Sequence, residues 1–375
     1  TGSLQTLNSG DRLDGGSGTD ELFAVVNGSV TPSSLTSIEN VSISAITNNA
    51  TVDLTNATGL SKVVNQGSST ALTVSGIATT VGVTVQDTAI AGQTVTYSSV
   101  TGTADAATIT LQNVTGAATL TAGGIETLNL VTTGTAANTL ANLTDANTST
   151  LNVSGTSALN VTLTGATAVR TIDASGLNAA LTVTPTTALA ATVTGGAGND
   201  AITLNRVVND AVAGGAGNDT ITFTGAGTLT VADTVAGGDG TDTLVGNITD
   251  LTALTAATVS LRTGLERITV SDAMGANTLT TANVQAGIER VTLATSNGGA
   301  STITMEAGDK TVALGAALTG SLTVNDTGVA ATDSLTVTNG AAATNAFGGQ
   351  NLAIAGYETV TLSTSGTGAT TAQTT

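Results

Sequence analysis

The segment TGGAGNDAITLNRVVNDAVAGGAGNDTITFTG, residues 194–225, contains the hexapeptide GGAGND twice, each time before a short apolar stretch. The two copies begin 19 residues apart, at 195 and 214. Related stretches, GGDGTDTLV and GGSGTDELF, cover 237–245 and 15–23. All four fit the template GGxGxDxUx, in which U is a large aliphatic residue. A nonapeptide that recurs in this way predicts a parallel β-roll, in which two nonapeptides make one coil and equivalent turns stack.

The chemistry of the template indicates a calcium site. Glycine permits turns that other residues disfavour, and tight turns direct carbonyl oxygens inward. The aspartate adds a carboxylate, and Ca²⁺ takes six to eight such oxygen ligands. The 19-residue interval predicts that Asp200 and Asp219 lie on neighbouring turns, and Asp242 follows after a small bulge. Two carboxylates about 4 Å apart would repel by roughly 4 kcal/mol at an effective dielectric near 20, and a divalent cation between them reverses that sign.

The candidate metal ligands are therefore the turn residues of these repeats. In the segment 191–246 they are Gly195, Ala197, Asp200, Gly214, Gly215, Ala216, Gly217, Asp219, Gly238, Gly240 and Asp242. In the N-terminal copy they are Asp11, Asp14, Gly15, Ser17 and Asp20, with GDRLD as the partner turn. The alternative is that the repeats are plain Gly–Asn–Asp turns between strands.

A second, looser repeat places a glutamate directly before a strand. It reads SIENVSI, GIETLNL, GLERITV, GIERVTL and GYETVTL, and the glutamates are Glu39, Glu126, Glu266, Glu289 and Glu358. We expect these carboxylates to cap turns by accepting backbone N–H bonds. A sharper alternative makes some of them calcium ligands, although the neighbouring Arg267 and Arg290 favour local ion pairs.

The rest of the chain also reads as short strands. Segments such as ALTVSGIATTVGVTVQD alternate apolar and polar residues, Thr is abundant, and 46 glycines punctuate the strands. We predict an all-β fold, a parallel β-solenoid or β-roll that can include β-sandwich-like segments. A series of Ig-like sandwiches is the alternative. The expected regions are 1–190, a β-rich solenoid-like region that opens with one repeat turn, 191–246, the calcium-binding β-roll, and 247–375, a second solenoid-like region.

Composition excludes several functions. The net charge of −18, from 26 acidic and 8 basic residues, argues against nucleic acid as a partner. No apolar run is long enough for a transmembrane helix. The chain has no cysteine and no histidine, so the common nucleophile–base pairs are missing, and we expect no catalysis. A calcium-dependent polysaccharide lyase would need a basic residue, but Arg206 is expected to be a solvated charge that offsets acidic neighbours.

The repeats, in an acidic, cysteine-free chain rich in Thr, Ala and Gly, resemble those of RTX (repeats-in-toxin) proteins. With the GIETLNL-type strands and TIDASGL at 171–177, the chain resembles calcium-binding surface-layer (S-layer) proteins of Gram-negative bacteria and related RTX adhesins. The resemblance implies type I secretion, an extracellular place on the cell surface, and self-assembly into a two-dimensional lattice. It also implies lipopolysaccharide as a partner, bound through a region that we do not find here, so we expect a fragment of a longer chain. A secreted adhesin or biofilm matrix protein that binds carbohydrate or cells is the alternative.

Overall fold

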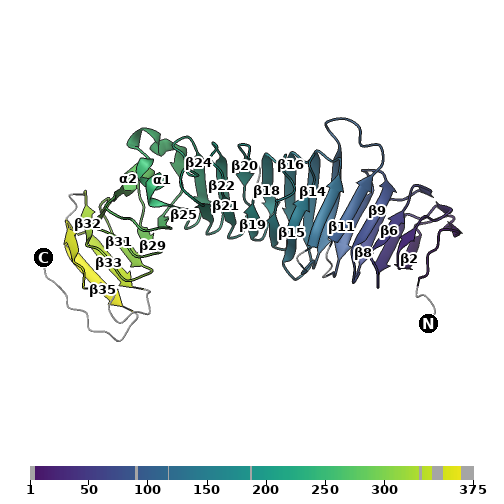
Figure 1. Cartoon of the computed structure of the whole chain (residues 1–375), viewed down its shortest axis with the longest axis horizontal. Coiled ribbons are helices and arrows are strands. Elements are labelled where there is room, and N and C mark those ends of the chain that lie inside the picture. Colours follow the sequence, from purple (N-terminus) through teal and green to yellow (C-terminus); the bar gives the residue numbers. More distant parts are fainter. Residues whose placement is uncertain are drawn as a thin grey trace. The chain divides into compact units, whose positions relative to one another are not determined.

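The computed structural model describes residues 5–88, 92–116, 118–185, 188–328, 332–339 and 349–364. The chain divides into two compact units, Thr1–Gly198 and Asn199–Thr375. Each unit is a stack of coils whose short strands build long parallel sheets, with few helical residues (Figure 1). The predicted all-β solenoid is confirmed.

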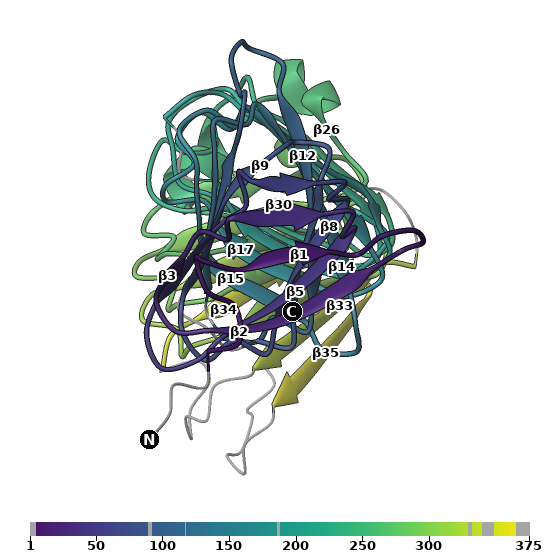
Figure 2. The ribbon, with the colours of Figure 1, turned by 90° about the vertical axis from the view of Figure 1, so that its right-hand side faces the viewer.

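The first unit contains three parallel sheets. One has the order β2 (Glu21–Val26), β5 (Asn40–Ala45), β8 (Lys62–Gln66), β10 (Gly82–Gln86), β12 (Ala106–Gln112), β14 (Thr127–Thr133), β16 (Thr150–Gly155), β18 (Thr171–Leu177), β20 (Thr192–Thr194). The second has the order β3 (Ser29–Val30), β6 (Ala50–Asp53), β9 (Leu72–Ile77), β11 (Gly92–Tyr97), β13 (Ala118–Gly123), β15 (Asn138–Thr144), β17 (Leu159–Thr162), β19 (Leu181–Thr184). A short third sheet joins β1 (Arg12–Asp14), β4 (Ser34–Thr36) and β7 (Ala57–Thr58), and Figure 2 shows β1, β2 and β3 of the first coils from the N-terminal end.

The second unit also contains three parallel sheets. The longest, here called the ladder sheet, has the order β21 (Ala201–Leu204), β23 (Thr220–Phe223), β25 (Thr243–Gly246), β27 (Arg267–Val270), β29 (Arg290–Leu293), β31 (Lys310–Leu314), β33 (Ser334–Asn339), β35 (Thr359–Thr364). The others are β22 (Ala211–Ala216), β24 (Thr234–Asp239), β26 (Arg262–Thr263), and β28 (Thr278–Thr280), β30 (Ser301–Met305), β32 (Leu322–Asp326), β34 (Leu352–Ala355). Two short helices, α1 (Ile248–Ala253) and α2 (Thr281–Val284), and a 3-10 helix (Ala256–Leu261) lie between strands.

Period-two alternation explains the core. In β14 every second residue is buried, and Leu128 and Leu130 have no exposed surface. Leu128 pairs with Leu151 of the next coil, so like residues stack along the solenoid axis. The strand pairs are parallel, for example β2 with β5, β12 with β14 and β33 with β35, whereas an Ig-like sandwich is antiparallel. The solenoid interpretation is therefore the correct one of the two.

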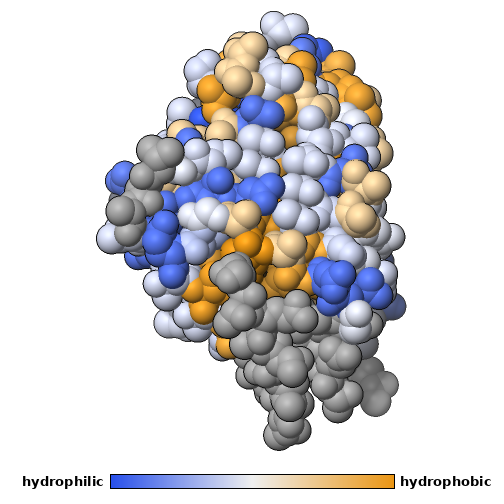
Figure 3. All heavy atoms as spheres, turned by 90° about the vertical axis from the view of Figure 1, so that its left-hand side faces the viewer, coloured by the Kyte–Doolittle hydropathy of each residue, from blue (hydrophilic) through white to orange (hydrophobic). Residues whose placement is uncertain are grey.

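The outermost described coil of the second unit is less buried than the coils before it. Val360 of β35 is 37% exposed, while its register partner Leu335 in β33 is fully buried. Leu352 and Ile354 of β34 and Leu362 of β35 are only half-buried. Figure 3 shows this end of the unit, with apolar surface between hydrophilic areas.

Polar side chains also form hydrogen bonds between neighbouring coils. In Asn297 both polar atoms of the side chain do so. Its Oδ1 accepts from the backbone N–H groups of Thr319 and Gly320, both at 3.0 Å, one coil later. Its Nδ2 donates to the carbonyl of Gly320 at 2.9 Å. The side chain is completely buried, so these bonds replace water for backbone groups in a turn.

We predict that Asn297→Ala lowers the free energy of unfolding by about 2 kcal/mol, because it leaves the buried N–H of Gly320 and the part-buried N–H of Thr319 without their acceptor. Urea unfolding at fixed calcium would measure the loss. Thr295→Ala, at an exposed position in the same turn, is the control and should stay within about 0.5 kcal/mol of the parent. Equal losses in the two variants would contradict the role given to Asn297.

Candidate metal centre

A ladder of three buried aspartates and one half-buried glutamate joins four successive coils of the second unit. The N–H of Asp200 donates to Asp219 Oδ1 at 2.8 Å, and the N–H of Asp219 donates to Asp242 Oδ1 at 2.7 Å. The N–H of Asp242 then donates to Glu266 Oε2 at 2.8 Å. The three aspartates are at most 2% exposed. The carboxylates of Asp219, Asp242 and Glu266 thus each satisfy a backbone donor of the coil before.

Strand register explains why these four residues stack. Each ladder residue directly precedes a strand of the ladder sheet, and the first strand residues pair as Ala201 with Thr220, Thr220 with Thr243, and Thr243 with Arg267. The aspartate of GGxGxD and the glutamate of the looser repeat therefore occupy one structural position. The two repeat families are alternative forms of the same corner.

The first glycine of each repeat makes room for the carboxylate of that repeat. A Cβ on Gly214 would overlap both Asp219 Oδ2 and the carbonyl oxygen of Gly237, one coil later. A Cβ on Gly237 would likewise overlap Asp242 and the carbonyl oxygen of Gly264. A carboxylate oxygen and a carbonyl oxygen from the next coil thus gather at the same point above a glycine. Such hard oxygens are the ligands that Ca²⁺ prefers.

The second oxygen of two ladder carboxylates has no partner. Asp219 Oδ2 and Asp242 Oδ2 are buried and accept no hydrogen bond. A buried carboxylate oxygen without a partner is costly, and a bound cation removes that cost. Within the described chain no three acidic side chains converge as a metal-binding group, so a cation here would take its remaining oxygens from backbone carbonyls. The residues present fit calcium in that form.

Burial shifts the acidity of the ladder. It raises the pKa of Asp219 to about 6, to which the charges of Asp200 and Asp242 add, against the N–H bond from Asp200. Burial likewise raises the pKa of Asp242, with contributions from the charges of Glu266 and Asp239. Without a cation, the ladder therefore favours the protonated forms of Asp219 and Asp242 more than solvent-exposed aspartates do.

The N-terminal repeat shows the same corner in the first unit. The N–H of Asp20 donates to Glu39 Oε2 at 2.8 Å, Asp20 Oδ2 has no partner, and a Cβ on Gly15 would overlap Asp20 and a carbonyl of the next coil. Asp11 and Asp14 instead make local bonds, from the N–H groups of Asn8 and Gly16. The structure thus gives Asp20 a ladder neighbour, Glu39, that sequence reasoning had placed in the other repeat family.

Of the remaining candidate residues, Gly215 and Ala216 lie at the end of β22 and Gly238 near the end of β24, and Gly217 and Gly240 directly follow these strands. Six glycines in the second and fourth places of the repeats have positive φ: Gly16, Gly18, Gly215, Gly217, Gly238 and Gly240. Ala197 donates its N–H to the Leu177 carbonyl at 2.9 Å, and Ala216 ends β22. Ser17 is exposed, and Gly195 directly follows β20.

Two further ladders lie outside any GGxGxD repeat and were missed from the sequence. Asp105 donates its N–H to Glu126 Oε2 at 2.9 Å, and Asp333 donates to Glu358 Oε2 at 2.8 Å. In both pairs the aspartate Oδ2 is buried without a partner. The turn-capping role predicted for the glutamates is confirmed at Glu39, Glu126, Glu266 and Glu358. Glu289 is exposed.

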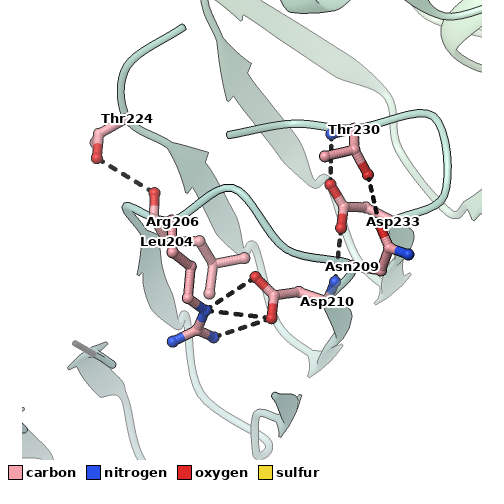
Figure 4. A network of polar contacts seen from close by, with 7 residues as sticks. All are labelled: Leu204, Arg206, Asn209, Asp210, Thr224, Thr230 and Asp233. Carbon is pink, nitrogen blue, oxygen red and sulfur yellow. Dashed lines mark hydrogen bonds and ion pairs between the residues drawn. The ribbon is translucent and has the colours of Figure 1, made fainter. Parts of the chain in front are cut away.

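A second carboxylate pair, before β22 and β24, is held by an arginine (Figure 4). The N–H of Asp210 donates to Asp233 Oδ1 at 2.6 Å. Arg206 donates to both oxygens of Asp210 at 3.1–3.2 Å and is only 7% exposed. The expectation that Arg206 is solvated was wrong: it does offset an acidic neighbour, but as a buried, bidentate ion pair.

The repeat segments match a known family. Residues 191–206, 209–222 and 232–248 match the model of the RTX calcium-binding nonapeptide repeat (4 copies). This family binds Ca²⁺, so calcium is the cofactor of the repeats. RTX repeats in a β-solenoid indicate a secreted RTX-type protein, of a kind that is typically structural. No curated protein matches the chain. Of the described helices, none has the length and apolar character needed to cross a bilayer.

We predict that Arg206→Gln lowers the free energy of unfolding by about 3 kcal/mol, because Asp210 keeps its buried charge and loses its partner. Urea unfolding at saturating calcium measures the change. The exposed Arg267→Gln is the control, expected within about 0.5 kcal/mol of the parent. An equal, small effect in both would show that the buried pair adds nothing to stability.

The raised pKa of Asp219 predicts a pH dependence of the calcium-free protein. Its folded pKa of about 6 exceeds the unfolded value of 3.8, so folding favours the protonated form. This contribution to stability is complete below the unfolded pKa and is lost as pH rises through about 6. Urea midpoints in chelator across this window should fall with pH, and Asp219→Asn should flatten the slope. Calcium binding should strengthen over the same window with release of protons; a midpoint that rises equally in both proteins would contradict the assignment.

Proposed function

We propose that this chain is a non-catalytic structural protein of the bacterial cell surface, which calcium orders and which assembles with copies of itself into an S-layer. The observation that carries the proposal is the set of buried, partnerless carboxylate oxygens at Asp219 and Asp242. They lie in the stacking contacts between coils, so the cation that satisfies them also fixes the coil stack.

We assign the ligands to the turns of the repeats. In this proposal the carboxylates of Asp219 and Asp242 bind calcium together with carbonyl oxygens of the turns above them, those of Gly237 and Gly264. Asp20 forms the corresponding site in the first unit. Asp219 takes part in two ladder steps, because it accepts from Asp200 and donates to Asp242, so its loss affects two turns.

The chemistry of the chain supports a structural role. The chain lacks histidine and cysteine, and its buried acidic groups are engaged by backbone N–H groups or by arginine. A general acid or base needs a polar group placed against a substrate, and these groups are committed between coils.

The charge balance supports calcium as the trigger of assembly. A chain with a net charge of −18 repels its own copies over a distance that salt shortens. Calcium lowers that charge and at the same time orders the turns that build the surface of each coil. Screening by monovalent salt supplies only the first of these effects.

We predict that calcium chloride, but not sodium chloride at the same ionic strength, causes the purified chain to assemble, as measured by light scattering. Negative-stain microscopy should show ordered two-dimensional sheets. Asp219→Asn should require at least about tenfold more calcium for the same scattering, and Asp20→Asn should require less than that, since Asp219 serves two turns.

The controls separate the alternatives. Equal assembly in sodium chloride would leave calcium without a specific role and would overturn the proposal. Calcium binding without sheets, with separate particles in the images, would favour the secreted adhesin or matrix protein. Sheets that form without added lipopolysaccharide would show that contacts between copies of the chain are sufficient for assembly.

A further inference from the structure

A cluster of side-chain oxygen atoms lies in the second unit about 80 residues or more after the last RTX repeat. Asp326 is the last residue of β32, Asp333 directly precedes β33, and Tyr357 and Glu358 directly precede β35. The GGxGxD template does not occur in this region.

One oxygen of each aspartate is fixed by a backbone donor. Asp333 Oδ1 accepts from the N–H of Gly308 at 2.7 Å, one coil earlier, and Asp326 Oδ1 accepts from the N–H of Gly328 at 2.6 Å. The N–H of Asp333 donates to Glu358 Oε2 at 2.8 Å. These bonds set the orientation of both carboxylates.

The other oxygens have no partner. Asp326 Oδ2, Asp333 Oδ2 and the Tyr357 hydroxyl are buried and make no hydrogen bond, and Asp333 is only 2% exposed. A Cβ on Gly356, the residue before Tyr357, would lie 2.9 Å from Asp326 Cβ, so these residues are neighbours. Burial raises the pKa of Tyr357, and the charges of Asp326 and Asp333 add to that shift. Three partnerless oxygens thus share one small region between β32, β33 and β35.

No positive charge in the described chain balances this cluster. Neither aspartate forms an ion pair with a lysine or arginine, and the nearest lysine in the strand register, Lys310, donates its Nζ to the Ile288 carbonyl at 2.9 Å. Burial first, then the side chain of Asp333 and the charge of Glu358, raise the pKa of Asp326. Two neighbouring carboxyl groups whose partnerless oxygens are buried, with no basic side chain of the described residues paired to them, hold either a shared proton or a cation.

We propose that Asp326, Asp333 and the Tyr357 hydroxyl form a second type of cation site, which takes a hard divalent ion of the size of calcium and joins the last described coils. Three oxygens of mixed charge suit Ca²⁺, whose coordination is flexible and accepts carbonyl or water oxygens for the remaining positions. A phenol oxygen and a two-carboxylate set are a weak match for Mg²⁺, which requires near-octahedral geometry. The site does not depend on lattice assembly.

The test uses Tb³⁺, a luminescent substitute for Ca²⁺ that a nearby tyrosine sensitises. The chain has no tryptophan and only two tyrosines, so tyrosine-excited emission reports on few places. Calcium-depleted full-length chain at neutral pH should give emission that saturates with Tb³⁺ and that calcium displaces. Tyr357→Phe should abolish most of it, whereas Tyr97→Phe should keep it.

Further variants assign the ligands. Asp326→Asn and Asp333→Asn should each weaken Tb³⁺ binding by about tenfold or more. Asp309→Asn, an exposed acid beside the cluster, is the matched control and should leave the titration unchanged. Asp219→Asn should also preserve the Tyr357 signal, which separates failure of this site from failure of the repeat sites.

Two results would overturn the proposal. Absence of saturable emission from folded parent protein at neutral pH would show that a shared proton, not a cation, occupies the pair. Emission that survives both aspartate substitutions would show that Tb³⁺ binds elsewhere near Tyr357. Circular dichroism of each variant confirms that the coils are intact, and calorimetry should count one ion fewer in Asp333→Asn than in the parent.

Discussion

The structure depends on one recurring hydrogen bond, from the backbone N–H of an acidic residue to the carboxylate one coil later. At a solenoid corner the chain leaves a strand, so corner N–H groups lose regular sheet partners and need other acceptors. A carboxylate supplies a strong acceptor, but it brings a buried negative charge into every step. The carboxylates therefore satisfy the backbone N–H groups but bury negative charge. The corners differ in which group compensates that charge.

Two kinds of compensation occur in the second unit. Before β22 and β24 a guanidinium group compensates the carboxylate charge, since Arg206 binds both oxygens of Asp210. In the ladder of Asp219 and Asp242 no arginine is present in that role, and one oxygen of each carboxylate remains without a partner. A guanidinium is a permanent part of the chain, whereas a metal ion exchanges with solvent. The Arg206–Asp210 corner therefore keeps its compensating charge without a metal ion, whereas in our proposal the ladder of Asp219 and Asp242 obtains it from calcium.

Much of this could be predicted from the sequence. The repeats GGAGND at 195 and 214 fix the coil length, and alternating aliphatic residues fix the parallel stack, because both patterns are local and periodic. The equivalence of Asp242 and Glu266 could not be seen, because it depends on register between strands and not on a shared motif. Arg206 was misjudged for a related reason: its partner Asp210 lies four residues away, but only the coil geometry shows that both are buried.

The backbone hydrogen bonds between coils also explain why these ladders end in glutamate. In the interior of a ladder the aspartate N–H is directed to the next coil, and the residue after it donates back, as Thr243 does to the Asp219 carbonyl at 2.8 Å. At the end of three ladders the glutamate donates its own N–H back to the aspartate carbonyl, as Glu266 does to Asp242 and Glu358 does to Asp333. No N–H then remains for a further carboxylate, so the ladder stops. The longer side chain of glutamate still reaches the N–H of the coil before it from this position, as the 2.8 Å bond from the Asp242 N–H to Glu266 Oε2 shows.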